Sequence, residues 1–245
     1  AVAQNATFAG NVRVGGTISS GAITTSGILT INNKLGINTS SPASWDGEGD
    51  DFVIYNTSYP GMTIATNSTT GRGSILWADG TTGSEKYRGG ITYDHGTGVS
   101  SSTVADSMYF RTAALIRATI TGAGNVGIGT MSPLVSLDVA HATHSRIRLT
   151  RADATVVSDE NLGSIEFASN DPSAGAVGAT IQARATSAWA SNDYPCHIRF
   201  LTTADGSGDQ AEVMRITDSG YVGIGTNDPN QQLSVRQGNG AYVEI

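Results

Sequence analysis

The chain has 245 residues and a formal net charge of −7, and only 14% of it is charged, whereas Gly (31) and Ser plus Thr (55) together make up about a third. An average soluble domain carries about 25% charged residues, so this composition favours polar strands and turns. The acidic balance and the lack of a basic cluster argue against nucleic acid as a partner. No apolar run approaches the roughly 20 residues of a membrane span, which predicts no membrane insertion.

Residues 1–33 contain short β-type runs that are separated by glycines at regular intervals, namely Gly10, Gly16, Gly21 and Gly27. Strands of four or five residues with such frequent turns are typical of a β-solenoid or an intertwined β-stalk. We therefore expect residues 1–42 to form an N-terminal β-stalk.

Three segments of the chain resemble one another: KLGINTSSP (34–42), NVGIGTMSP (125–133) and YVGIGTNDP (221–229). Upstream of the last two, similar residues recur at an offset of 90, as in Ile75 and Ile165, and Phe110 and Phe200. A repeat of this length predicts two homologous β-rich modules, at 43–136 and 137–245. The apolar alternation at 137–139 and 233–235 is interpreted as the first strand of a following unit. Helical periodicity is nearly absent, so the predicted fold class is all-β.

The repeated motif predicts the backbone conformation of its residues. Side chains alternate along a strand, so each VGI run has one apolar face and one bare face, which is typical of close approach by another backbone. Six residues form this structural motif: Gly127, Gly129, Pro133, Gly223, Gly225 and Pro229. Asn38 occupies the place of Gly129 in the first segment. Because Asn tolerates positive φ best among non-glycine residues, we expect a left-handed residue there, and we expect Asn to be tolerated.

The stretches 117–133 and 215–229 resemble phage tail-fibre repeats, whose units end in GNVGIGT, two variable residues and Pro. GSILWADG, YRGGITYDH and GSIEFASND are similar to the upstream parts of such modules, and ATFAGNVRVGGTISSGAITTSG is similar to the stalk before them. The resemblance implies an elongated fibrous homotrimer in the virion. It also implies other tail proteins as partners and contact with the host surface. In such fibres a trimerisation chaperone often follows the last repeat, and nothing in this sequence resembles one.

The low charge also favours an oligomer, because a soluble monomer usually carries about 25–35% charged residues on its surface. Neighbouring chains would then cover much of what a monomer exposes. A Ser/Thr-rich monomeric sandwich remains the alternative.

Aromatic residues are few, and two pairs of them flank polar loops. Trp77 and Tyr87 flank residues 78–86, and Trp189 and Tyr194 flank 190–193, which contain Asn192 and Asp193. Sugars are commonly held by an aromatic face beside amides and carboxylates. These six residues are the candidate ligand-binding set, for which a host glycan is the expected ligand. Core packing is the competing interpretation for Trp77.

The sequence assigns no catalytic residue, no cofactor and no metal site. Residues 122–127 fit GxGxxG, but no helix follows to receive a pyrophosphate. His141 and His144 are spaced to lie on opposite faces of a strand, and the acidic stretch 46–51 lacks EF-hand spacing. The predicted function is a structural and host-recognition segment of a tail fibre. Two alternatives stay open: a head or collar fibre without a receptor, and a glycan hydrolase that uses acids such as Asp46, Asp94 or Asp193.

Overall fold

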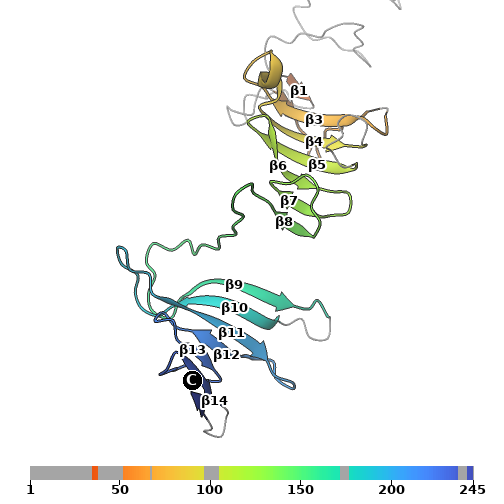
Figure 1. Cartoon of the computed structure of the whole chain (residues 1–245). Helices are drawn as coiled ribbons and strands as arrows, with labels where there is room; N and C mark the ends of the chain where they lie inside the picture. The colour runs from red at the N-terminus through yellow and green to blue at the C-terminus, as the bar shows by residue number, and fades with distance from the viewer. Residues whose placement is uncertain are drawn as a thin grey trace, which may run out of the picture.

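The computed structural model describes residues 35–37, 52–66, 68–96, 105–171, 177–236 and 242–244, and it is all-β there apart from one 3-10 helix, η2 (Gly83–Tyr87). Two large sheets are joined by the connection that follows β8 (Figure 1). The predicted fold class is confirmed for these residues. The strands expected within residues 1–33 lie outside them.

The first sheet has six strands in chain order: β3 (Arg72–Trp77), β4 (Gly89–Asp94), β5 (Ser107–Thr112), β6 (Leu115–Ile120), β7 (Val126–Ile128) and β8 (Leu137–Val139). The second has seven: β9 (Asn161–Ala168), β10 (Val177–Ala185), β11 (Cys196–Thr203), β12 (Gln210–Ile216), β13 (Val222–Ile224), β14 (Leu233–Arg236) and β15 (Tyr242–Glu244). A third, small sheet pairs β1 (Leu35–Ile37) with β2 (Phe52–Ile54).

Neighbouring strands in both large sheets are antiparallel, except for one parallel pair in each. β7 pairs in parallel with β8, and β13 with β14. β1 and β2 are also a parallel pair. The apolar alternations at 137–139 and 233–235 therefore do form strands, and each pairs with the VGI strand that precedes it in the chain. The module boundaries at 43–136 and 137–245 remain a prediction.

The residues that recur at an offset of 90 occupy equivalent places in the two sheets. Ile75 lies opposite Ile91, which lies opposite Phe110. In the second sheet Ile165 lies opposite Ile181, which lies opposite Phe200. Both rows continue through the VGI strand, at Ile128 and Ile224 respectively. The sequence similarity thus corresponds to one cross-strand row of apolar side chains in each sheet.

The repeated glycines have the backbone that the motif predicts. Gly129 and Gly225 have φ of +77° and +67°, as expected for left-handed residues. A Cβ on Gly127 would lie 2.5 Å from the Thr130 carbonyl oxygen and 3.4 Å from Pro133 Cδ. The bare face of the VGI strand is therefore covered by the turn that contains the motif proline, and the predicted close approach of another backbone is confirmed.

The expectation that Asn can replace Gly129 is wrong. A Cβ on Gly129 would collide with the Ala140 carbonyl oxygen, and a Cβ on Gly225 with the Arg236 carbonyl oxygen. Each carbonyl belongs to the residue that ends or follows the parallel strand. Asn tolerates the dihedral angle but still carries a Cβ, so the steric constraint applies to Asn as well as to Ala.

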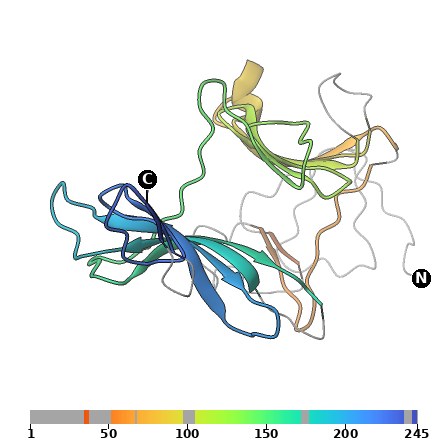
Figure 2. The same ribbon diagram turned by 60° about the horizontal axis from the view of Figure 1, so that its bottom comes forward.

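Each large sheet is a single layer of strands with two faces of opposite character (Figure 2). The apolar face of the first sheet carries Ile75, Trp77, Ile91, Tyr93, Met108, Phe110, Ile120, Ile128, Leu137 and Val139. The apolar face of the second sheet carries Ile165, Phe167, Ile181, Ile198, Phe200, Met214, Ile216, Ile224 and Val235. Eight of the first ten side chains are exposed, and so are Ile165, Phe167, Ile198 and Ile224.

The opposite, polar face is the one that the chain itself covers. In the first sheet Thr92, Asp94, Ser107, Tyr109 and Thr119 are buried. Buried polar side chains require hydrogen-bond partners, and the ion pair between Arg72 Nε and Asp94 Oδ2, at 2.8 Å, supplies one. Domains normally bury the apolar face of a sheet against a second layer. Here Ile64, beside Gly73, and Leu149, beside Gly163, reach the apolar faces, but many large side chains on these faces stay exposed. This raises the question of what covers them.

Candidate functional site

The loop between β10 and β11 brings four of the candidate residues together. Ala190 and Asp193 exchange two backbone hydrogen bonds, of 3.0 and 3.1 Å, and so close a tight turn. Asn192 within this turn has φ of +60°, in the left-handed region that Asn tolerates better than most residues. Trp189 and Tyr194 immediately flank the turn, so the loop presents them from a fixed base.

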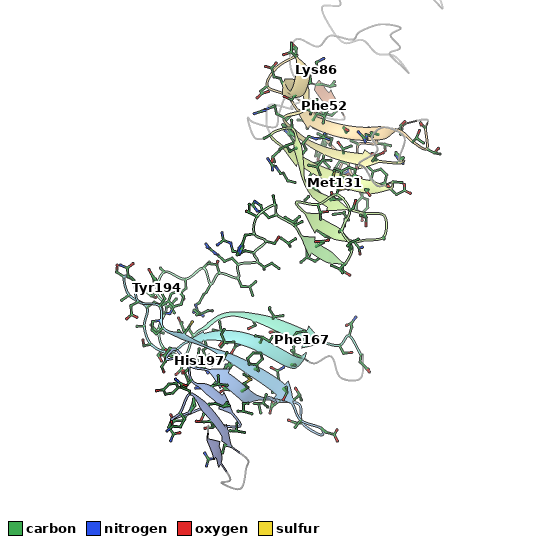
Figure 3. All side chains as sticks on the ribbon, viewed as in Figure 1. Phe52, Lys86, Met131, Phe167, Tyr194 and His197 are labelled. Atoms are coloured by element: carbon green, nitrogen blue, oxygen red, sulfur yellow. The ribbon has the colours of Figure 1, made fainter. Side chains whose placement is uncertain are left out.

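The two aromatic rings of this loop contact each other. Trp189 and Tyr194 meet edge to face, with ring centroids 5.4 Å apart and an interplanar angle of 69°. Trp189 Nε1 donates to the Pro195 carbonyl at 3.2 Å, and its backbone N–H donates to the Val156 carbonyl at 3.0 Å. Tyr194 remains 59% exposed, at the opposite end of the second sheet from Phe167 (Figure 3). Trp189 is therefore the anchored ring and Tyr194 the accessible one.

Asp218, which the sequence analysis did not single out, lies beside this loop. Thr186 Oγ1 donates to Asp218 Oδ2 at 2.7 Å, and this hydrogen bond is the main reason why the pKa of Asp218 is lowered. Asp193, Tyr194, Pro195, Asp218 and Ser219 line one shallow hollow. Two carboxylates next to an exposed aromatic ring suit a ligand rich in hydroxyl groups. Because Asp218 comes from the β12–β13 turn, only the fold places it there, and no local signal marks it.

Trp77 and Tyr87 are not brought together. Trp77 ends β3 and belongs to the apolar face of the first sheet, where it is 57% exposed. Tyr87 ends η2, and it lines a hollow with residues of the polar face. The guanidinium carbon of Arg111 lies 5.6 Å from the centroid of the Tyr87 ring. The two aromatic residues thus take part in different surfaces, and the ring available to a polar ligand is that of Tyr87.

Asp94 and His141, two further candidate groups, take part in hydrogen bonds within the fold. Asp46 lies outside the described residues. Asp94 is fully buried, pairs with Arg72 and accepts a hydrogen bond from the Gly96 backbone N–H at 3.2 Å. Its carboxylate is therefore committed to structure. The His141 ring nitrogen Nδ1 accepts from the backbone N–H groups of Thr143, at 3.3 Å, and His144, at 3.4 Å, in an exposed turn.

The part of the chain that the structure describes contains neither a metal-ligand cluster nor a membrane-spanning helix. There, no group of three or more His, Cys, Asp and Glu side chains is arranged to hold a metal ion. No helix among the same residues has the length and apolar character needed to cross a bilayer.

A cluster of charges occupies the polar face of the second sheet around His197. Glu212 receives hydrogen bonds from Arg215 and pairs with Arg199 at 3.6 Å. His197 is 6% exposed, and neither ring nitrogen has a hydrogen-bond partner among the described residues. Burial, followed by the charge of Arg215, lowers the pKa of His197. The surroundings of the ring therefore disfavour its protonated form.

Comparisons with known proteins found likeness among solved structures only. No family model matches the chain, and no curated protein matches it. The carboxy-terminal domain of the bacteriophage T5 L-shaped tail fibre with its intramolecular chaperone domain aligns with 78% of this chain, at a TM-score of 0.30 and 12% identity. This chain covers 65% of that T5 chain. The same T5 domain without the chaperone also aligns with 78% of the chain, at a TM-score of 0.29 and 10% identity, and 95% of it is covered. Likeness at this level leaves the function to be argued from the chain's own residues.

Proposed function

We propose that the chain is a structural segment of a homotrimeric phage tail fibre in the virion, and that loops of its modules bind a glycan or protein on the bacterial surface. The observation that carries the proposal is the pair of exposed apolar sheet faces. Soluble monomers rarely expose contiguous apolar patches of more than a few hundred Å², and here both large sheets expose large side chains on their apolar face, among them Trp77, Phe110, Ile165 and Phe167. Copies of the same chain supply a matching apolar face for each of them.

The resemblance of the repeats to trimeric fibres selects three copies rather than two. Three single-layer sheets whose apolar faces meet around a shared axis form a closed core, and their polar faces then point outward. Burial of each large apolar side chain contributes about 1.5–3 kcal/mol. Several such side chains from each sheet, supplied by three chains, give a large and mainly apolar interface, as in obligate oligomers.

The experiment is the mass of the native chain in solution, measured by light scattering after size exclusion. We expect about three times the 25.2 kDa of one chain. Phe110→Asp and Phe200→Asp each place a charge in the centre of one apolar face, so we expect them to dissociate or unfold the assembly. Ala204→Asp, in an exposed turn, is the matched control and should leave the mass unchanged. A folded wild-type monomer would contradict the proposal, and so would a dimer.

The recognition part of the proposal rests on the loop that contains Trp189 and Tyr194. It combines exposed aromatic surface with carboxylates and backbone amides on a rigid base. Loops held by a rigid scaffold are where binding residues are usually found.

A further inference from the structure

We propose that the polar face of the first sheet holds a second ligand site, around Arg111 and Tyr87, and that this site binds a carboxylated sugar residue. The inference rests on the proposed recognition of a surface glycan and adds the chemical class of one ligand. It is independent of the loop at Trp189, because the two sites lie on different sheets.

A hollow of about 340 Å³ marks the site, which is within the range of small-molecule pockets. Its lining combines cationic, hydroxyl, aromatic and aliphatic groups: Arg72, Ser74, Leu76, Tyr87, Thr92 and Arg111. The fold builds it from one end of the first sheet. β3, β4 and β5 lie side by side there, and η2 returns the chain so that Tyr87 borders the same hollow.

Gly90 is the middle residue of a cross-strand row that borders the hollow. Leu76, Gly90 and Arg111 lie opposite one another on adjacent strands. A Cβ on Gly90 would come within 2.8 Å of Leu76 Cδ2 and 3.2 Å of the Ile75 carbonyl oxygen. The Leu76 side chain therefore leans over the glycine. This places an aliphatic surface on the hollow beside the two arginines.

The two arginines of the hollow differ in what holds them. Arg72 donates through Nε to the buried carboxylate of Asp94 at 2.8 Å. Arg111 lies over the Tyr87 ring, and no carboxylate pairs with it among the described residues. A guanidinium over an aromatic face keeps its charge and its planar set of donors. Arg111 is therefore the cation of this hollow that is available to an anionic ligand.

The remaining lining groups fit the rest of a sugar better than a bare anion. Ser74 Oγ and Thr92 Oγ1 lie 3.0 Å apart and share a hydrogen bond, so their remaining hydrogen-bonding capacity matches ring hydroxyls. The ring of Tyr87 and the side chain of Leu76 offer surface for the C–H groups of a pyranose. A carboxylate on the sugar would meet the fork of Arg111, which recognises carboxylates through two parallel hydrogen bonds.

The test is a saturation-transfer NMR titration of the native full chain with methyl α-D-galacturonoside, compared with the neutral methyl α-D-galactoside. We expect saturable binding of the acidic sugar and at least about tenfold weaker binding of the neutral one, because a charge-assisted hydrogen bond is lost. Arg111→Gln should weaken binding of the acidic sugar by a similar factor. Arg117→Gln is the matched control, since it removes the same charge from β6 outside the hollow, and it should change nothing.

Three results would overturn the inference: no saturable binding of the acidic sugar, equal binding of the two sugars, or unchanged binding by Arg111→Gln. Inorganic phosphate separates a sugar site from a plain anion site. Phosphate bound as tightly as the galacturonoside, with neither affected by Tyr87→Leu, would also overturn it. The mass of the same sample keeps the two proposals apart. A trimer that binds no acidic sugar overturns this inference alone, whereas a folded monomer contradicts the proposed function whatever the sugar result.

Discussion

Gly129 and Gly225 are each constrained twice, by the sign of φ and by a carbonyl oxygen where a Cβ would be. We expect Gly129→Ala and Gly129→Asn both to lower the free energy of unfolding, by about 2 kcal/mol or more, because relief of one constraint leaves the other. Gly124 is the matched control: its φ is +85°, and no atom lies within 4 Å of a Cβ built there.

Urea unfolding of the four variants with Ala or Asn at positions 129 and 124 measures these effects. Gly124→Asn should be close to wild type, and Gly129→Asn should be nearly as unstable as Gly129→Ala. A stable Gly129→Asn variant would show that the carbonyl of Ala140 moves away freely. The parallel pairing of β7 and β8 would then be less rigid than its hydrogen bonds indicate.

His197 predicts a pH dependence of stability. Its pKa in the folded chain is lowered from the usual value of about 6.5, by burial first and then by the positive charge of Arg215. As the pH falls below about 6.5, the unfolded chain takes up a proton that the folded chain resists, so the stability decreases. At higher pH both states are neutral and this contribution is constant.

Melting temperatures between about pH 7.5 and 5.5 measure this effect. Replacement of His197 by Gln should flatten the decrease in this window, whereas replacement of the exposed His141 by Gln should leave the slope as it is. Equal slopes for wild type and His197→Gln would contradict the assignment. The slope is the informative quantity, because any substitution of a buried ring also changes stability at every pH.

At the scale of structural elements, the β10–β11 loop predicts a separation of binding from folding. Its turn is closed by backbone hydrogen bonds of Ala190 and Asp193, which do not depend on the aromatic side chains. We expect Trp189→Ala combined with Tyr194→Ala to leave the assembly folded. We also expect it to weaken binding of the labelled protein to a bacterial strain that the wild type binds, by tenfold or more when three loops act together.

Tyr59→Ala is the matched control for this loop, because Tyr59 is an exposed aromatic residue at 94% exposure outside both candidate sites. Its binding to the same cells should equal that of the wild type. Undiminished binding by a folded double mutant would remove the loop as a receptor contact and leave the hollow at Arg111 as the candidate.

At the scale of the whole molecule, association and folding are expected to be one process. The described part of a single chain buries few apolar side chains in its large sheets, Tyr109 and Ala185 among them, so in the proposed trimer its stability would depend on apolar faces that the other copies cover. The melting temperature should therefore rise with protein concentration, as it does when only the assembled state is folded. Differential scanning fluorimetry over a hundredfold dilution series checks this. A melting temperature independent of concentration, in a reversible transition, would contradict it.

Much of the fold could be predicted because its signals are local. Alternation at 137–139 and 233–235 predicted strands that the structure contains, and the offset between Ile75 and Ile165 corresponds to equivalent places in the two large sheets. The left-handed backbone at Gly129 followed from the motif alone. The strand that pairs with Leu137–Val139 could not be predicted from the sequence, because the pairing depends on the direction in which the Thr130–Pro133 turn leads the chain. The same pairing places the Ala140 carbonyl oxygen next to Gly129, and the motif alone does not reveal this contact.

The candidate sites were predictable to the extent that they are contiguous in sequence. Trp189 and Tyr194 are five residues apart, and a single tight turn keeps them together. Trp77 and Tyr87 are ten residues apart and η2 intervenes, so their distance in sequence does not predict on which face of the sheet each ring lies. Arg111 and Asp218 come from other strands and turns. Alternation along β5 places Arg111 on the polar face, but only the sheet register brings it to Tyr87.

The one parallel pairing within each large sheet has a consequence for how such a molecule can change in length. β8 runs in the same direction as β7, and β14 runs in the same direction as β13. Val139 and Val235 thus occupy equivalent positions, each opposite the isoleucine of the preceding VGI strand. Recombination between the gene segments that encode these two points would remove or duplicate one set of strands, β9 to β14. The pairing at the new junction would match that at the old ones, so length would vary in sets of strands rather than in single strands.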